Sequence, residues 1–191
     1  MAKDKIKNKF KNLIISIPPL YRFLYYIRRR LRNVDETSQM VTRKELEFLL
    51  QISGRGKEII EIGSAIGQTT RRLSKNNQII AIDPFIPNEN GLLLTKIAKD
   101  AHHEFLQNIK GRDVIFFNMT SEKALEYWEK AIKRKVDGIF IDGEHTYEAV
   151  KKDSKWIKYI KSGGFIAFHD VDYKNKIKNF IEEEISPKYE L

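Results

Sequence analysis

Acidic and imidazole side chains gather at two places in the sequence where they could move a proton or bind a cation. Asp142 and His145 follow one short apolar stretch, and His169 and Asp170 follow another. If these stretches are neighbouring parallel strands, their carboxyl ends bring the four side chains to one edge of the sheet. Because imidazole suits general base catalysis and carboxylates suit divalent cations, this edge is the predicted catalytic site.

A glycine-containing loop lies earlier in the chain, between an apolar stretch and the start of a helix. Glu61 is followed by Gly63 and Gly67. Glycine allows a sharp bend and the close approach of a ligand, and a helix start presents free N–H groups. The dinucleotide fingerprint would also need glycine where this chain has Ala65 and Gln68, so the spacing disfavours NAD and FAD. The alternative is a purely structural turn.

Asp83 ends the next apolar stretch, about 20 residues after the glycine loop. A carboxylate at this position hydrogen-bonds a ribose diol in many α/β nucleotide sites, although a solvated acid at a strand end is the simpler alternative. Its combination with the glycine loop favours the cofactor role. Further on, Thr120, Ser121 and Glu122 begin a predicted helix, where such residues act first as a cap.

The apolar periodicity predicts alternating strands and helices, which is typical of an α/β fold with a parallel sheet. The predicted strands are 59–62, 78–82, 113–117, 139–141 and 165–168, and the predicted helices are 42–50, 68–73, 92–109, 121–128, 147–160 and 175–185. Thr42 and Glu45 have the spacing of a capping box at the start of the first helix. His102 and His103 are adjacent, so they cannot both face one site, and both are expected on the surface.

The composition separates a basic segment from a neutral domain. The 191 residues fit one α/β domain with a short extension. The net charge is +9, and residues 1–33 hold ten Lys or Arg against one acid, so the domain 34–191 is balanced. The absence of cysteine excludes disulfides, thiolate metal sites and cysteine nucleophiles, and it fits a cytoplasmic protein.

Residues 1–33 divide at Pro18 and Pro19 into two pieces, neither of which is long and apolar enough to span a bilayer. Arg28–Arg30 stand where a secretory signal would have small residues. In the second piece, apolar residues share a helical stripe beside the arginines. This pattern predicts an amphipathic helix that lies on an anionic membrane surface or packs on the domain, and a nucleic-acid-binding arm is the third alternative.

Four motifs occur in order: I-E-I-G-S-x-x-G-x-T at 60–69, I-D-P at 82–84, I-D-G-x-H-x-Y-x-x-V at 141–150 and G-G-x-x-x-x-H-D at 163–170. Together they resemble the catechol O-methyltransferase-like branch of the class I S-adenosylmethionine (SAM)-dependent methyltransferases, particularly the group with macrocin-type sugar O-methyltransferases. The resemblance covers about residues 38–186 and implies a Rossmann-like, mostly parallel sheet. It implies that SAM is bound by Glu61, Gly63, Ser64, Ala65, Gly67 and Thr69, its ribose by Asp83 and its adenine by Thr120, Ser121 and Glu122.

The same resemblance implies that His145 is the general base and that Asp142 and Asp170 bind a divalent cation, Mg²⁺ or Mn²⁺. In metal-dependent relatives a carboxylate commonly precedes the second metal-binding aspartate, whereas this chain has His169. Magnesium prefers oxygen ligands, so an imidazole here weakens a magnesium site and favours a softer ion or no metal.

The expected reaction is O-methylation of a hydroxyl on a small molecule, sugar or glycolipid. The alternatives are methylation of RNA or protein with the help of the basic segment, and a non-catalytic SAM-fold interaction module. The sequence IDGEH at 141–145 replaces the [DN]PP[YF] motif of base N-methyltransferases. Few residues follow the helix 175–185, so the last antiparallel hairpin of the sheet is expected to be missing, and an exposed sheet edge favours a homodimer.

Overall fold

The computed structural model describes residues 41–85, 101–171 and 176–189. The predicted amphipathic extension 1–33 lies outside the described residues, as does the first part of the helix predicted at 92–109. Within the described ranges, no helix is both long enough and apolar enough to cross a membrane.

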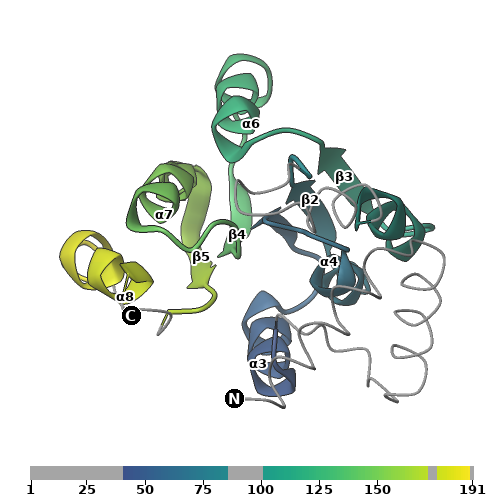
Figure 1. The fold of residues 1–191 in the computed structure, drawn as a ribbon, viewed down its shortest axis with the longest axis horizontal. Coiled ribbons are helices and arrows are strands. Elements are labelled where there is room, and N and C mark those ends of the chain that lie inside the picture. The colour runs from purple at the N-terminus through teal and green to yellow at the C-terminus, as the bar shows by residue number, and fades with distance from the viewer. Residues whose placement is uncertain (1–40, 86–100, 172–175, 190–191) are drawn as a thin grey trace, which may run out of the picture. The chain divides into compact units, whose positions relative to one another are not determined.

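Five parallel strands form the central sheet (Figure 1). They are β1 (Glu58–Ile62), β2 (Gln78–Ile82), β3 (Val114–Phe117), β4 (Val136–Ile141) and β5 (Ile160–Phe168). Their order across the sheet is β3-β2-β1-β4-β5, and all four pairings are parallel, which confirms the predicted α/β fold. The order reverses between β1 and β4, and open α/β sheets bind their ligands at such a switch point.

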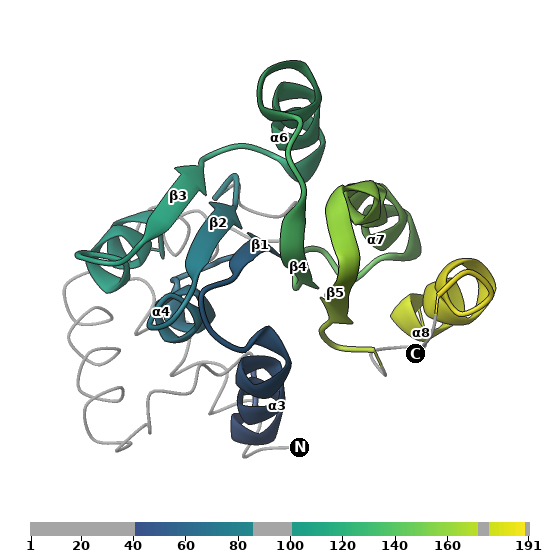
Figure 2. The ribbon, with the colours of Figure 1, turned by 180° about the vertical axis from the view of Figure 1, so that it is seen from behind.

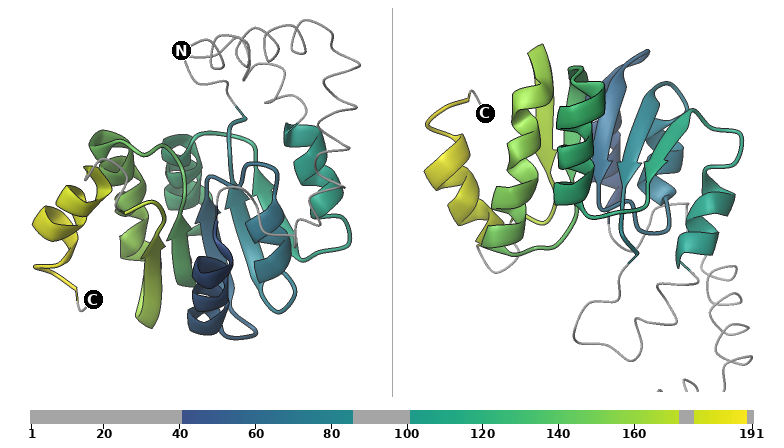
Figure 3. Two further views of the ribbon diagram at one scale, coloured as in Figure 1. Left: turned by 60° about the horizontal axis from the view of Figure 1, so that its bottom comes forward. Right: turned by 90° about the horizontal axis from the view of Figure 1, so that it is seen from above.

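Helices cover both faces of the sheet (Figures 2 and 3). One face carries α3 (Arg43–Ser53), α4 (Gln68–Leu73) and the helical residues 101–108, and the other carries α6 (Ser121–Tyr127) and α7 (Tyr147–Asp153). The short helix α8 (Lys176–Phe180) packs against α7. The described helices therefore lie where the sequence periodicity predicts them.

Two separate cores hold the strands in place, because successive side chains of a strand point to opposite faces. Ile59 and Ile79 are fully buried with Phe105 on the α4 face. Ile60, in contrast, is buried with Trp128 on the α6 face. Burial on both faces explains why the strands read as continuous apolar runs. Burial on both faces also holds in place the carboxyl ends of the strands, which carry the polar residues.

The first turn of α3 has the predicted capping box. The Thr42 N–H donates to the Glu45 carboxylate at 2.7 Å, and the Glu45 N–H donates to the Thr42 hydroxyl at 3.3 Å. Two N–H groups that have no partner within the helix are thereby satisfied. The box also fixes the position of the Glu45 side chain at the start of the helix.

The strand β5 begins earlier than the sequence predicted. Val136 pairs with Ile160 and Gly138 pairs with Phe165, so the chain between these two pairs bulges out of register. A Cβ atom at Gly138 would lie 2.2 Å from the ring of Phe165. The glycine therefore lets this ring lie over β4. The glycines at 163 and 164 mark a bulge inside a strand rather than the end of a helix.

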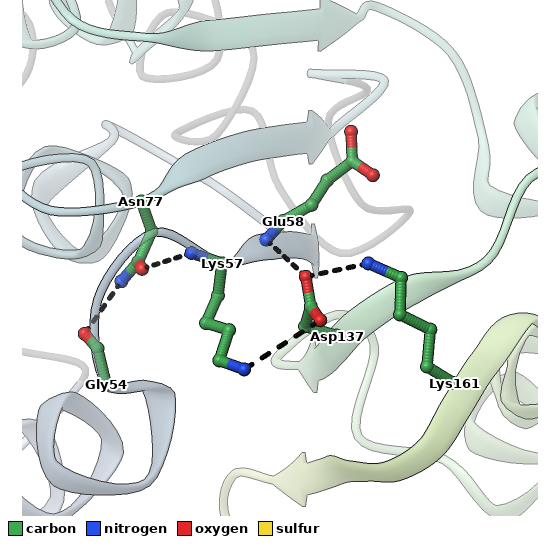
Figure 4. Close-up of polar contacts among 6 residues, drawn as sticks. All are labelled: Gly54, Lys57, Glu58, Asn77, Asp137 and Lys161. Atoms are coloured by element: carbon green, nitrogen blue, oxygen red, sulfur yellow. Dashed lines mark hydrogen bonds and ion pairs between the residues drawn. The ribbon is translucent and has the colours of Figure 1, made fainter.

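A polar cluster ties the amino ends of β1 and β4 together (Figure 4). The Asp137 carboxylate accepts hydrogen bonds from the Glu58 N–H at 2.9 Å and from Lys161 Nζ at 3.0 Å. Burial raises the pKa of Asp137, but these donors and the nearby Lys57 outweigh it and hold the pKa below its ordinary value. The cluster stabilises the sheet edge opposite to the carboxyl ends of the strands.

Candidate active site

The loops that follow β1 and β4 touch through their backbones. Gly63 has a φ of +90°, and a Cβ atom on it would lie 2.1 Å from the carbonyl oxygen of Asp142. The Asp142 N–H also donates to the Ile62 carbonyl at 2.8 Å. The sequence predicted that this glycine allows a sharp bend and the close approach of a ligand. The structure adds a nearer reason, since any side chain here would push the two loops apart.

Gly67 closes the glycine loop and begins α4. Its N–H donates to the Ser64 carbonyl at 2.7 Å, and its φ is +76°. A Cβ atom on Gly67 would lie 2.7 Å from the ring of the fully buried Phe105. Thr69, in the first turn of α4, is also buried. The loop is thus tightly packed from the side of the helices.

Glu61 lies beneath the loop and is only 1% exposed. Its carboxyl group accepts a hydrogen bond from the Thr70 hydroxyl on α4. Burial raises the pKa of Glu61 to about 8, and the carboxylates of Asp142 and Asp83 add to the effect, while the Thr70 and Ser64 hydroxyls oppose it. Glu61 is therefore neutral at pH 7. It supports the loop from within. The predicted contact with the cofactor stays a prediction.

Asp83 fixes the other side of the loop. One carboxylate oxygen accepts from the Ala65 N–H at 2.8 Å, and the other accepts from the Phe85 N–H at 2.7 Å. Burial raises the pKa of Asp83 despite these two donors. Each carboxylate oxygen has a second lone pair, so the predicted bond to a ribose diol remains available. This acid holds the loop and lies at the loop's edge.

Sequence reasoning missed one histidine beside this acid. The ring of His102 stacks on that of Phe85 with centroids 4.8 Å apart, and it lies 5.8 Å from the ring of Phe116. The charge interaction with His102 also acts to lower the pKa of Asp83. The expectation of a surface position is correct for the exposed His103 and wrong for His102. The three-residue spacing from the apolar Phe105 could have indicated which histidine faces inward.

The three residues predicted to bind adenine are engaged within the protein. The Thr120 hydroxyl caps α6 by accepting from the Lys123 N–H at 3.4 Å. The Ser121 hydroxyl is buried and accepts from Trp156 Nε1 at 3.0 Å. Glu122 forms an ion pair with Lys152 on α7 at 2.9 Å. Their side chains thus stabilise α6, and their predicted contact with adenine stays a prediction.

The polar residues after β4 and β5 converge, as the sequence predicted. His145 Nε2 lies 3.3 Å from Asp170 Oδ2. His169 Nδ1 lies 3.0 Å from Asp142 Oδ1 and 3.5 Å from Asp170 Oδ1. Glu45 joins this group from α3, with its Oε2 atom 3.6 Å from His169 Nε2. The sequence indicated Glu45 only as a helix cap, because its approach to β5 depends on the tertiary fold.

The charges of this group are partly balanced within the protein. Contact with Asp142 raises the pKa of His169 to about 9, and Asp170 and Glu45 contribute, while burial opposes the shift. Burial raises the pKa of Asp142, and its contact with His169 opposes this. At neutral pH, His169 is therefore an imidazolium that lies among carboxylates.

The predicted metal ligands do not fit a divalent cation in this arrangement. Magnesium and manganese sites need several oxygen atoms directed at one point. Here Asp142 Oδ1 and Asp170 Oδ1 both face Nδ1 of His169. Among residues 41–85, 101–171 and 176–189, no group of three or more acidic or imidazole side chains is arranged to hold a metal.

The glycine loop, in contrast, fits a polar cofactor. The side-chain oxygen of Gln68, at the start of α4, is buried and lacks a hydrogen-bond partner in the described part of the chain. A buried acceptor of this kind is usually completed by water or a ligand. The loop also lies at the switch point of the sheet, next to the group around His145.

Comparison with known proteins identifies the family. Residues 60–171, which are more than half of the chain, match a family described as a methyltransferase domain. An uncharacterized protein, R132 of Acanthamoeba polyphaga mimivirus, is 29% identical over 122 residues, which are 60% of this chain. The match covers 52% of that protein, so the chain spans about half the length of this relative.

Solved structures share the fold at low sequence identity. The SAM complex of the O-methyltransferase TomG from Streptomyces achromogenes has a TM-score of 0.57 and 13% identity, over 75% of this chain and 67% of that chain. The TDP-rhamnose 3'-O-methyltransferase CalS11 has a TM-score of 0.52 and 12% identity, over 97% and 86%. The family match over residues 60–171 shows that the chain belongs to this methyltransferase-domain family, and the solved structures share its fold.

Proposed function

We propose that this protein is an O-methyltransferase that transfers a methyl group from SAM to a hydroxyl of a small molecule, sugar or glycolipid. The observation that carries the proposal is the contact between the Gly63 turn and the Asp142 loop, which brings the cofactor loop and the group around His145 together. TomG and CalS11, which share only the fold, are O-methyltransferases of this reaction class.

SAM would be held by the backbone of the loop from Gly63 to Gly67, by the side chain of Gln68 and, at its ribose, by Asp83. When bound, it supplies an electrophilic methyl group on sulfur. The protein must align an acceptor oxygen with that methyl group, and alignment alone contributes up to about 7–11 kcal/mol to such reactions. The rigid contact between the two loops supports this alignment.

His145 would take the proton from the acceptor hydroxyl. Its side chain is 27% exposed, so an acceptor can reach it, and Asp170 lies 3.3 Å from Nε2. That carboxylate orients the ring and stabilises the imidazolium that forms when the proton arrives. An aliphatic hydroxyl is weakly acidic, so removal of its proton needs a base positioned in this way.

Calorimetric titration of SAM into the full chain tests the cofactor assignment. We expect saturable binding to the wild type and a large loss of affinity in Asp83→Ala, because this change removes both the ribose partner and the acceptor that fixes the Ala65 N–H. Asp113→Ala is the matched control, since it removes an exposed acid before β3. Absence of SAM binding to the wild type would refute the proposal.

The acceptor can be sought by mass spectrometry of glycans and lipids from cells with and without the protein. With the acceptor in hand, we expect His145→Gln to lower kcat by about 10²–10⁴-fold, because a general base contributes about that much. His103→Gln, on an exposed helical position, should keep full activity. An unchanged kcat in His145→Gln would remove this residue from the mechanism.

We also propose that residues 1–33 contact an anionic membrane surface from the cytoplasmic side, because they carry ten basic residues against one acid. Co-sedimentation with phosphatidylserine vesicles should then exceed that with neutral vesicles. Salt-sensitive binding to RNA without vesicle binding would instead favour RNA methylation.

Normal SAM affinity without methylation of any hydroxylated acceptor would favour a non-catalytic module. Analytical ultracentrifugation tests the expected homodimer.

A further inference from the structure

The geometry points to a methyl-transfer site that needs no divalent cation, because the imidazole of His169 fills the space between Asp142 and Asp170. This inference rests on the proposed function, since it concerns how the same site is organised. Its evidence, however, is the arrangement of side chains at the ends of β4 and β5 and at the start of α3.

Carboxylates from three elements converge on the His169 ring. Asp142 Oδ1 lies 3.0 Å and Asp170 Oδ1 lies 3.5 Å from Nδ1, and Glu45 Oε2 lies 3.6 Å from Nε2. The His169 side chain is 4% exposed and that of Asp142 is 7% exposed. Three carboxylates close together repel one another, so each needs a positive partner. In this site each of them forms an ion pair with histidine.

A metal ion would have to displace this ring. Asp142 Oδ1 and Asp170 Oδ1 both face Nδ1 of His169, so the ring occupies the position where these two atoms would share a cation. The ring also packs edge-on against Phe140, with centroids 6.3 Å apart at an angle of 77°. If a metal ion displaced the His169 ring, a gap would remain in this packed region. The metal ion and the positively charged imidazole would then lie side by side.

Asp170 also lies close to both histidines of the site. The two oxygens of this carboxylate face different histidines, Oδ1 toward His169 at 3.5 Å and Oδ2 toward His145 at 3.3 Å. Asp170 has a φ of +52°, in the left-handed region that aspartate enters more readily than most non-glycine residues. The Asp170 carboxylate therefore lies between the two histidine rings.

The reaction balances without a metal. The bond from the acceptor oxygen to the methyl carbon forms as the carbon–sulfur bond breaks, and the electron pair stays on sulfur in S-adenosylhomocysteine. The acceptor proton passes to His145 and from there to water. The carboxylate of Asp170 stabilises the protonated ring during turnover.

Electron paramagnetic resonance of Mn²⁺ mixed with the full chain tests this inference independently of any acceptor. We expect the wild type to leave the spectrum of free Mn²⁺ unchanged at millimolar concentrations. His169→Asp replaces the ring with a third inner carboxylate and should bind Mn²⁺ at least about tenfold more tightly than the wild type. His103→Asp adds the same charge at an exposed position and should behave like the wild type.

Saturable Mn²⁺ binding to the wild type that is lost in Asp142→Asn would overturn the inference, and this comparison needs no His169 variant to fold. Once an acceptor is known, full methylation in the presence of EDTA is expected, and loss of activity that Mg²⁺ or Mn²⁺ restores would also overturn it. Failure of the wild type to bind SAM would refute the proposed function instead. The two failures are therefore distinguishable.

Discussion

At the scale of single residues, Glu61 is a buried acid that supports the glycine loop from beneath. The side chain is buried and bonded to Thr70, and its pKa of about 8 keeps it neutral at pH 7. Unfolding exposes this carboxyl group to water, where its pKa returns to about 4.5. Between these two pH values, the folded state holds a proton that the unfolded state releases.

The stability of the domain should therefore fall as the pH rises from about 4.5 to about 8. Glutamine cannot ionise and keeps an oxygen for the Thr70 hydroxyl, so Glu61→Gln should lack this loss. Because one pKa unit is worth about 1.4 kcal/mol, we expect its advantage over the wild type to grow by a few kcal/mol between pH 5 and pH 8. Urea unfolding at both pH values measures the difference.

Glu126→Gln, at an exposed position on α6, serves as the control and should match the wild type at both pH values. An equal effect of pH on Glu61→Gln and the wild type would show that Glu61 is ionised in the folded protein.

Residue types in the sequence indicated a candidate site, but not the contacts that each side chain makes there. Gly63 was recognisable from the motif, whereas its contact with the Asp142 carbonyl joins positions far apart in the chain. Ser121 has the type and place of a ligand-binding residue, yet its hydroxyl is engaged by Trp156. The inward position of His102 likewise depends on packing against Phe85. No local pattern carries such contacts.

At the scale of elements, the period of the apolar residues predicted the strands well because both faces of the sheet are buried. The exception is β5, where the glycines at 163 and 164 imitate the end of a helix. The start of α3 was predicted correctly, since a capping box is a local signal. Its second role is tertiary, because the same box holds Glu45 near His169.

Thr42→Ala should lower the free energy of unfolding by about 0.5–2 kcal/mol, because the Glu45 N–H loses its acceptor. Thr42→Ser keeps the hydroxyl and should stay close to the wild type. Urea unfolding measures both variants, and the change should appear in the midpoint rather than in the slope. Equal destabilisation by alanine and serine would mean that the methyl group, not the cap, matters.

At the scale of the whole molecule, the carboxyl ends and the amino ends of the strands have different roles. The carboxyl ends carry the glycine loop, Asp83 and the histidine group, whereas the amino ends are tied by the Asp137 cluster (Figure 4). The sequence predicted the fold class. It also predicted that distant motifs lie at one end of the sheet, because the carboxyl ends of parallel strands lie together.

Asp137→Ala should therefore lower stability by about 1–3 kcal/mol, because the Glu58 N–H loses its acceptor at the sheet edge. The affinity for SAM should remain at the wild-type value at a temperature where the variant is folded. Thermal unfolding and calorimetry give the two quantities. A weaker affinity for SAM in the folded variant would show that the two edges are coupled.

The backbone contact between Gly63 and Asp142 has a consequence for attempts to redirect this enzyme to new acceptors. In the proposed mechanism, SAM and His145 belong to the two loops that this contact joins, so a substitution that moves either loop would displace both partners of the reaction. A misplacement of about 1 Å can cost about 100-fold in rate. Libraries for altered selectivity should therefore leave Gly63 and Asp142 unchanged.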